Sequence, residues 1–167
     1  MAHRAPLRRS PTRNKADHRF FPAFFGFVDQ ELRSFLFGTA ANFTDHDDRL
    51  GLIIGQVLAT TCAQVTIAGK HENKLEVARG LGLNVAHVDS LGGSRKVDLV
   101  VDATGRPDGL PIALKLLRPR GTVVLKSTFH GETSLLLWPT VVDEFKIIGS
   151  RCGPFPPAID HLVSGRV

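Results

Sequence analysis

The chain has 167 residues, a formal net charge of +5 and two cysteines. This length suits one domain with a sizeable core and is too short for two full domains. The first 20 positions hold six of the 21 basic residues and one acidic residue, so the rest of the chain is neutral. The basic character belongs to the N-terminal tail and does not indicate a nucleic-acid-binding domain.

The two cysteines, Cys62 and Cys152, stand 90 positions apart, outside any Cys-x-x-Cys or Cys/His motif. This usage is typical of a reducing compartment and predicts a cytoplasmic protein without a disulfide framework or a structural zinc site. No apolar run approaches the roughly 20 residues that a membrane span needs, so no membrane association is expected.

Residues 1–19 are rich in Arg, Pro and Ser without hydrophobic periodicity, which predicts disorder. This segment is either a solvated tail or an organellar transit segment, and both interpretations stay open. The Phe-rich stretch at 20–28 and a short amphipathic pattern at 29–37 have no confident assignment. We therefore expect residues 1–48 to form an unassigned, largely disordered tail, with order beginning at Leu50.

Beyond the tail, helical and extended apolar segments alternate. Residues 50–59 are apolar almost all round, as in a helix buried in an α/β domain, where Gly51 and Gly55 would allow close approach to a strand. Two strands are predicted at 64–68 and 85–88. Between them we expect a helix at 72–81, with Leu75, Ala78 and Leu81 facing inward and Gly82 as its C-terminal cap.

The segment 96–126 predicts a strand, a helix and a second strand. Both extended runs are almost continuously apolar, as in parallel strands buried on both faces. The helix carries apolar residues from Leu110 to Leu117 and is ended by Pro119 and Gly121. A strand at 145–149 and a helix at 156–163 follow. This alternation indicates a Rossmann-like doubly wound parallel sheet of five or six strands.

In such sheets ligands bind beyond the carboxyl ends of the strands, here at Thr104–Gly105 and Ser127–Thr128. Ser127 could line a ligand pocket or belong to a plain turn at the strand end. Asp102 could orient an adenosine, or accept a hydrogen bond from neighbouring backbone. These alternatives stay open at the level of the sequence.

Five motifs occur in one order along the chain: LGLIIGQVLA, VTIAGKHENKLEVARGLG, DLVVDATGRPDGLPIAL, RPRGTVVLKSTFHG and VVDEFKIIGSRCGPF. In these motifs residues 49–167 resemble the medium-chain dehydrogenase/reductase superfamily, and within it the cofactor domain of zinc-type alcohol dehydrogenase-like proteins. The resemblance implies a nicotinamide-dinucleotide-binding domain of an oxidoreductase that acts on an alcohol or polyol. The cofactor-binding residues it implies are Leu50, Gly51, Gly69, Lys70, His71, Thr104, Gly105 and Ser127.

The glycine fingerprint G-x-G-x-x-G of such domains departs from its usual pattern here. Aligned on Leu50–Gly51, its three positions are His46, Asp48 and Gly51, so only the packing glycine is present. Carboxylates would then face the cofactor's diphosphate, but Asp47 and Asp48 can also cap the following helix, and this is the interpretation that we favour. We expect weak or undetectable dinucleotide binding.

The resemblance also implies zinc, held mostly by a domain that precedes the cofactor domain. Nothing in residues 1–48 resembles that domain, so the sequence yields no metal ligand and no catalytic residue, and we expect no turnover from this chain alone. Residues 1–48 read as unrelated sequence joined to a truncated dehydrogenase segment. The scattered histidines (His71, His87, His130 and His161) lack the i, i+4 spacing of a helical metal site.

The second strand predicts the choice of cofactor. An NAD-preferring domain ends this strand with an acidic residue that binds the ribose hydroxyls. Gly69 stands there instead and Lys70 follows it, which predicts NADP over NAD. Glu72 is the one feature against this, although in the first turn of a helix it would serve the helix dipole.

A second function class is a non-catalytic interaction module. In dimeric members of the superfamily the strand matching Phe145–Gly149 pairs across the subunit interface, so a homodimer through this strand is expected. An exposed sheet edge can pair with another chain without any cofactor. Nucleic-acid binding is not expected, because no aromatic residue is interleaved in the basic tail before Phe20.

Overall fold

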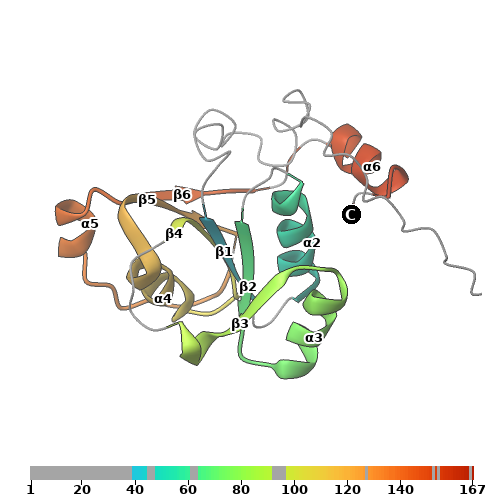
Figure 1. The fold of residues 1–167 in the computed structure, drawn as a ribbon. Coiled ribbons are helices and arrows are strands. Elements are labelled where there is room, and N and C mark those ends of the chain that lie inside the picture. The colour runs from blue at the N-terminus through green and yellow to red at the C-terminus, as the bar shows by residue number, and fades with distance from the viewer. Residues whose placement is uncertain are drawn as a thin grey trace, which may run out of the picture.

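The computed structural model of the chain describes residues 39–44, 48–60, 64–91, 97–126, 128–151, 153, 155–165 and 167. Figure 1 shows strands and helices that alternate along the chain. In chain order the elements are β1 (Thr39–Thr44), α2 (Asp48–Ala59), β2 (Gln64–Gly69), α3 (Glu72–Gly80), β3 (Asn84–His87), the 3-10 helix η3 (Val88–Ser90), β4 (Val97–Ala103), α4 (Gly109–Leu116), β5 (Leu117–Leu125), α5 (Trp138–Val142), β6 (Lys146–Gly149) and α6 (Phe155–Val163).

The six strands form one sheet in the order β3-β2-β1-β4-β5-β6, and every neighbouring pair runs parallel. Parallel strands are joined by helical crossovers, which cover the sheet and bury its strands on both faces. The run Leu99–Ala103 of β4 agrees with this, since all five of its residues are buried. The predicted Rossmann-like doubly wound parallel sheet is therefore confirmed.

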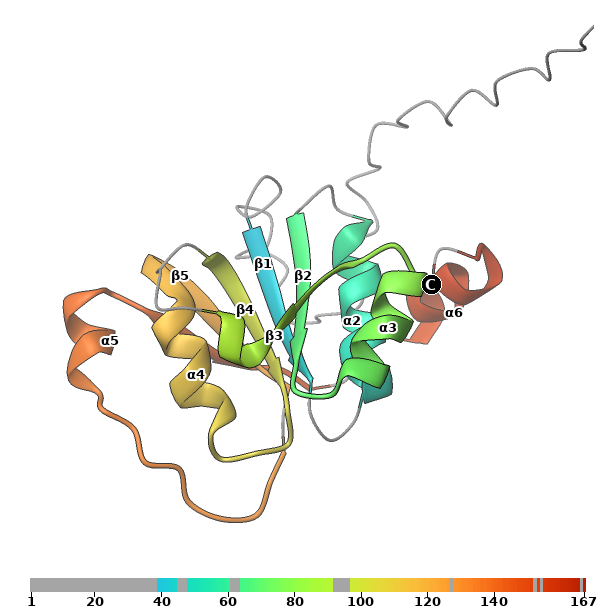
Figure 2. The ribbon, with the colours of Figure 1, turned by 60° about the horizontal axis from the view of Figure 1, so that its bottom comes forward.

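The core has two parts because successive residues of a strand face opposite sides of the sheet. One part joins α2 and α3 to the sheet through Ile54, Leu58, Leu75, Ala78, Leu99 and Val101. The other part joins α4 to the sheet through Val100, Ala113, Leu114, Leu116 and Val123. Figure 2 shows this division, with α2 and α3 on one side of the sheet and α4 on the other.

The helix α2 approaches the sheet very closely at Gly55. A Cβ atom built on Gly55 would stand 2.4 Å from Cδ1 of Ile67 in β2, closer than real Cβ atoms come to their neighbours. The predicted role of this glycine in helix–strand packing is confirmed. Ile53 of the same helix is exposed, so α2 is not buried all round as its apolar sequence predicts.

The strand β1 corrects the sequence analysis, which expects no ordered element before Leu50. Thr39–Thr44 lies at the centre of the sheet and pairs with β2 on one side and β4 on the other. Its sequence TAANFT has a single large apolar residue and lacks the run that marks the other central strands. Pairing along both edges therefore outweighs weak local preference. The expectations for residues 1–38 and 45–47 lie outside the described residues.

Several predicted boundaries also shift. Helix α4 ends at Leu116, and Leu117 already belongs to β5, whose pairing with β4 is irregular until Thr122. Leu81, expected to face the core, is 47% exposed because α3 ends one residue earlier. Gly82 has a φ of 76°, which agrees with its predicted place just beyond the helix.

The strand β6 forms one edge of the sheet and pairs with β5. Its range and that of α6 match the predicted strand and helix to within one residue. The short helix α5 precedes β6 and is not predicted by the sequence analysis; Trp138, Val141 and Val142 in it are exposed. Within the described ranges, no helix is long and apolar enough to cross a membrane.

Candidate functional site

The carboxyl ends of β2, β1 and β4 lie side by side, at the end of the sheet where its parallel strands finish. Phe43 of β1 stands opposite both Ala68 of β2 and Asp102 of β4 in the strand register. Strands are about 4.8 Å apart, so β2 and β4 are separated by about 10 Å across β1. The chain turns from β1 toward β2 on one side and later returns to β4 on the other. This switch point is where open α/β sheets bind ligands.

Asp102 lies near the end of β4 and organises the turn that follows. It is 1% exposed, and its Oδ1 accepts hydrogen bonds from the backbone N–H of Thr104 at 2.9 Å and from the Thr104 hydroxyl at 2.8 Å. The Thr104 Oγ1 in turn accepts the backbone N–H of Arg106 at 3.2 Å. The structure thus favours a hydrogen bond to neighbouring backbone as the role of Asp102.

Gly109, the first residue of α4, touches the same carboxylate. A Cβ atom built on it would stand 2.6 Å from Oδ1 and 2.7 Å from Oδ2 of Asp102, and 2.4 Å from Oγ1 of Thr104. The helix N-terminus therefore lies directly against a buried carboxylate, which its dipole stabilises. We call Asp102, Thr104 and Gly109 the buried network.

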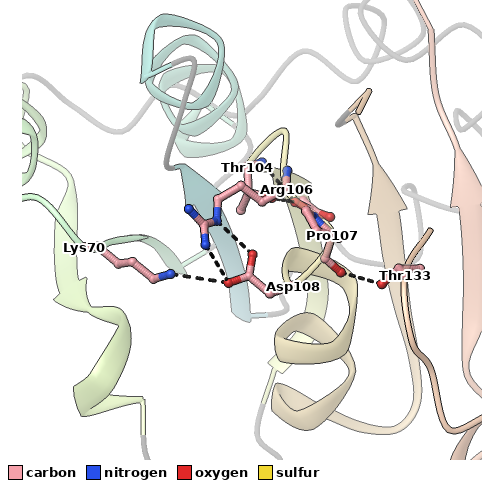
Figure 3. Close-up of polar contacts among 7 residues, drawn as sticks. Lys70, Thr104, Arg106, Pro107, Asp108 and Thr133 are labelled. Carbon is pink, nitrogen blue, oxygen red and sulfur yellow. Dashed lines mark hydrogen bonds and ion pairs between the residues drawn. The ribbon is translucent and has the colours of Figure 1, made fainter. Parts of the chain in front are cut away.

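A second group of side chains lies closer to solvent, beyond the same carboxyl ends of the strands. We call Lys70, Arg106 and Asp108 the charged cluster. Arg106 binds Asp108 through two hydrogen bonds, from Nε to Oδ1 at 2.9 Å and from Nη2 to Oδ2 at 3.1 Å. Lys70 Nζ lies 3.4 Å from the same Oδ2. Figure 3 shows Lys70 reaching from the end of β2 and Arg106 from the loop after β4 toward this one carboxylate.

Asp108 is ionised at neutral pH. The hydrogen bonds from Arg106, with the charges of Lys70 and Arg106, lower the pKa of Asp108 to about 2. All three side chains are between 37% and 47% exposed, so solvent weakens these attractions. The charged cluster carries one net positive charge, at the carboxyl ends of the strands, where a ligand could reach it.

The backbone around both cations is held in place by hydrogen bonds. On the β2 side, His87 Nε2 lies 3.0 Å from the carbonyl oxygen of Lys70, to which it donates in the matching tautomer. On the β4 side, the Thr133 hydroxyl donates to the carbonyl oxygen of Pro107, as Figure 3 shows. The two loops that present Lys70 and Arg106 are therefore fixed by contacts to other elements.

Most of the predicted cofactor-binding residues lie at or near the carboxyl ends of these strands. Leu50 and Gly51 belong to the first turn of α2, Gly69 is buried at the end of β2, and Lys70 and His71 are exposed beyond it. On the other side of β1 come Thr104, which is buried, and Gly105, which is partly buried. Ser127 lies outside the described residues. Their part in cofactor binding stays a prediction.

The sequence analysis misses Arg106 and Asp108. Their signal is present in the letters TGRPDG, where charged residues follow the end of a buried strand. The sequence analysis assigns Glu72 to the helix dipole, and the structure also gives this residue a partner on its own helix. Arg79 Nη1 lies 2.5 Å from Glu72 and 2.5 Å from Glu76. Glu72 therefore serves an ion pair along α3.

Among the described residues, no three His, Cys, Asp or Glu residues lie close enough together to hold a metal ion. The described part of the chain therefore offers no set of side chains that fits zinc.

The profile of the family described as zinc-binding dehydrogenase matches residues 50–164. None of the curated proteins matches the chain. Among solved structures, L-idonate 5-dehydrogenase from Escherichia coli K-12 is similar, with a TM-score of 0.72 and 18% identity over 93% of this chain and 49% of that one.

Two further structures contain a cofactor. One is described as a zinc-binding dehydrogenase from Sinorhizobium meliloti 1021 bound to NADP, with a TM-score of 0.69 and 18% identity over 78% of this chain and 43% of that one. The other is an alcohol dehydrogenase from E. coli CFT073 in complex with NADH, with a TM-score of 0.69 and 26% identity over 79% and 42%.

The present chain thus spans less than half the length of the solved structures it resembles. The six-stranded parallel sheet agrees with the fold of these solved structures. The chain belongs to the zinc-binding dehydrogenase family, and residues 50–164 are a cofactor-domain segment of the medium-chain dehydrogenase/reductase superfamily.

Proposed function

We propose that this chain binds a nicotinamide dinucleotide across the carboxyl ends of β2, β1 and β4. The observation that carries the proposal is the order β3-β2-β1-β4-β5-β6, whose switch point lies between β1 and β4. The adenosine half would lie beside Gly69 and Lys70, and the rest of the cofactor would pass Thr104 and Gly105 toward β5.

The bound cofactor would supply the hydride acceptor of an oxidoreductase reaction on an alcohol or polyol. The residues of this chain bind and orient it. Gly69 leaves room for the ribose at the end of β2, and the first turn of α2 directs its N–H groups toward the diphosphate. Names of similar structures, such as L-idonate 5-dehydrogenase, support a polyol-like substrate. We expect no turnover from this chain alone.

The cofactor choice follows from the end of β2. No carboxylate occupies the position of Gly69, and Glu72 is directed to Arg79, so neither of these two residues strongly repels a 2′-phosphate. Lys70 supplies a cation within reach. We infer a preference for NADP over NAD of about 1–2 kcal/mol, the strength of one charge-assisted hydrogen bond. A cytoplasmic location is part of this proposal and rests on the cysteine usage.

The test is calorimetric titration of NADP and NAD against the chain and against the variant His46→Gly/Asp48→Gly. The parent should bind weakly, because two fingerprint glycines are absent, and the variant should bind more tightly. Lys70→Ala in the variant should remove most of the preference for NADP. Equal affinities for both cofactors, or no binding to either protein, would contradict the proposal.

The second candidate function is a non-catalytic interaction module that forms a homodimer through β6. In the described part of the chain β6 pairs with β5 alone and forms the sheet edge, and its Ile147 is exposed. The exposed apolar residues of α5 precede it. Light scattering should give a dimer for the parent and a monomer for Ile147→Lys. The control Val77→Lys changes an exposed residue on α3 and should leave the dimer intact. A parent that stays monomeric at high concentration would refute the dimer.

A further inference from the structure

The charged cluster joins the two loops on either side of β1. Lys70 follows β2, whereas Arg106 and Asp108 follow β4, and β1 separates these strands in the sheet. The ion pair between Lys70 and Asp108 therefore joins these two loops at the switch point of the sheet, where sheets of this kind bind ligands.

We propose that Lys70 and Arg106 together form the binding site of the 2′-phosphate of NADP, and that Asp108 is a built-in anion which the phosphate displaces. This inference rests on the proposed dinucleotide-binding function and adds two residues to it. Arg106 becomes a second cation for the phosphate, and Asp108 becomes the residue that sets how tightly a 2′-phosphate is bound.

The geometry of the cluster carries the proposal. Lys70 Nζ and Arg106 Nη2 lie 3.4 Å and 3.1 Å from the same oxygen of Asp108. One anion is thus already contacted by both cations, so a phosphate group that replaces the carboxylate could contact both as well. Arg106 binds the carboxylate with two nitrogens, a fork that suits phosphate oxygens equally well.

Both cations are presented by loops whose backbone is already hydrogen-bonded. Lys70 is held through its carbonyl by His87, and Pro107, next to Arg106, is held through its carbonyl by Thr133. Arg106 also donates its backbone N–H to Thr104, a member of the buried network. Side-chain rotation alone would let a ligand replace Asp108, and little ordering of backbone would be needed.

Electrostatics favour the replacement of the Asp108 carboxylate by a phosphate group. A phosphate monoester carries about −1.5 to −2 charges at neutral pH, whereas the carboxylate carries one. The ion pairs of Asp108 are partly exposed, and such pairs contribute little to stability, so they are easily given up. Asp108 nevertheless repels the incoming phosphate until it moves, which makes its charge the main barrier to tight binding.

The experiment uses two isomers of equal charge, 2′-AMP and 5′-AMP, titrated calorimetrically against the full chain. Asp108→Asn removes the competing charge and should tighten 2′-AMP binding about tenfold, with less than a twofold effect on 5′-AMP. Arg106→Gln should weaken 2′-AMP binding about fivefold and leave 5′-AMP almost unchanged.

The matched control is Asp98→Asn. Asp98 pairs with an arginine as well, Arg118, but lies within β4 near its first residue, at the opposite end of the strand from the charged cluster. This variant changes the net charge equally and should leave 2′-AMP binding unaltered. Equal effects of the two Asn variants, or no effect of Asp108→Asn, would overturn the proposal.

The two proposals fail in different ways. If the protein binds NADP and NAD but Asp108→Asn leaves the affinity for 2′-AMP unchanged, the proposed phosphate site is wrong. The proposed dinucleotide-binding function would still hold in that case. Binding of NAD without any binding of 2′-AMP would have the same meaning. Absence of binding by every nucleotide, in the parent and in the glycine-restored variant, would overturn both.

Discussion

The carboxylates of the buried network and of the charged cluster, Asp102 and Asp108, lie close together in the sequence, at the end of β4 and in the turn that follows it, yet their surroundings differ. Asp102 is 1% exposed, accepts two hydrogen bonds from Thr104 in its own turn, and lies close to Gly109. Asp108, six residues later, lies partly in solvent and takes its partners from two separate loops.

This difference separates a structural role from a binding role. A buried carboxylate is held by fixed donors, and its removal leaves those donors without an acceptor where water cannot replace it. An exposed carboxylate can exchange its partners with solvent or with another anion at small cost. Substitutions in the buried network should therefore change stability, whereas substitutions in the charged cluster should change ligand affinity.

The largest effect is expected from Gly109→Ala. The new methyl group would collide with both oxygens of Asp102 and with the hydroxyl of Thr104, all of which are buried. Relief requires α4 to move from the sheet or the hydrogen bonds of Asp102 to break, so we expect a loss of about 3 kcal/mol or more in the free energy of unfolding. Urea denaturation followed by circular dichroism measures it.

Gly80→Ala is the matched control for this substitution. Gly80 also lies in a helix, α3, but a Cβ atom built there meets no other atom within 4 Å. Alanine should be neutral at this position or stabilise the protein by about 0.5–1 kcal/mol, because it restricts the unfolded chain. Similar losses for the two glycine variants would contradict the close approach at Gly109.

A somewhat smaller loss is expected from Asp102→Ala. The backbone N–H and the hydroxyl of Thr104 would lose their acceptor in a buried turn, at a cost of about 2–3 kcal/mol in the free energy of unfolding. Asp102→Asn keeps an oxygen acceptor and should cost less. If alanine and asparagine destabilise the protein equally, the hydrogen bonds are not what holds this turn.

Two buried threonines sharpen the same comparison. Thr104 donates to Asp102, whereas the hydroxyl of Thr122 in β5 has no hydrogen-bond partner among the described residues. Thr104→Val should therefore cost about 1–2 kcal/mol of stability, and Thr122→Val should be neutral or stabilise the protein by up to about 1 kcal/mol. Thermal denaturation of both variants checks this, and the opposite ranking would refute it.

These residues also show how far the sequence leads. The apolar runs of β4 and β5 predict buried parallel strands, and the alternation of strands and helices predicts the doubly wound sheet, because burial on both faces dictates composition. The strand β1 is not predictable in this way. Its six residues are mostly small or polar, and their conformation depends on pairing with β2 and β4, which are distant in the chain.

The candidate site is predicted in part for the same reason. The ends of strands can be located along the chain, which finds Gly69, Lys70, Thr104 and Gly105. Asp108 contacts Lys70, which stands 38 positions earlier in the sequence, and this contact depends on the strand order β2-β1-β4. No local pattern contains this order, so the sequence analysis predicts the cation and misses the carboxylate that holds it.

The smallest effect on stability is expected from Asp108→Asn, and its pH dependence identifies the cause. The pKa of Asp108 is lowered from 3.8 to about 2 in the folded protein, chiefly by hydrogen bonds from Arg106. A carboxyl group with a depressed pKa contributes stability above its unfolded pKa and loses that contribution as the pH falls through the folded value. The contribution is therefore complete at neutral pH and declines between about pH 4 and pH 2.

Because the side chains of the charged cluster are partly exposed, solvent reduces this contribution to no more than about 1 kcal/mol. Urea denaturation of the parent and of Asp108→Asn at pH 7, 5, 4 and 3 should show a small difference in favour of the parent that narrows below pH 4. Added salt should narrow it at pH 7 as well, since exposed charges are screened. A difference that is equally large at pH 3 and pH 7 would mean that Asp108 acts through packing, and the exchange of its carboxylate for a phosphate would then lose its electrostatic basis.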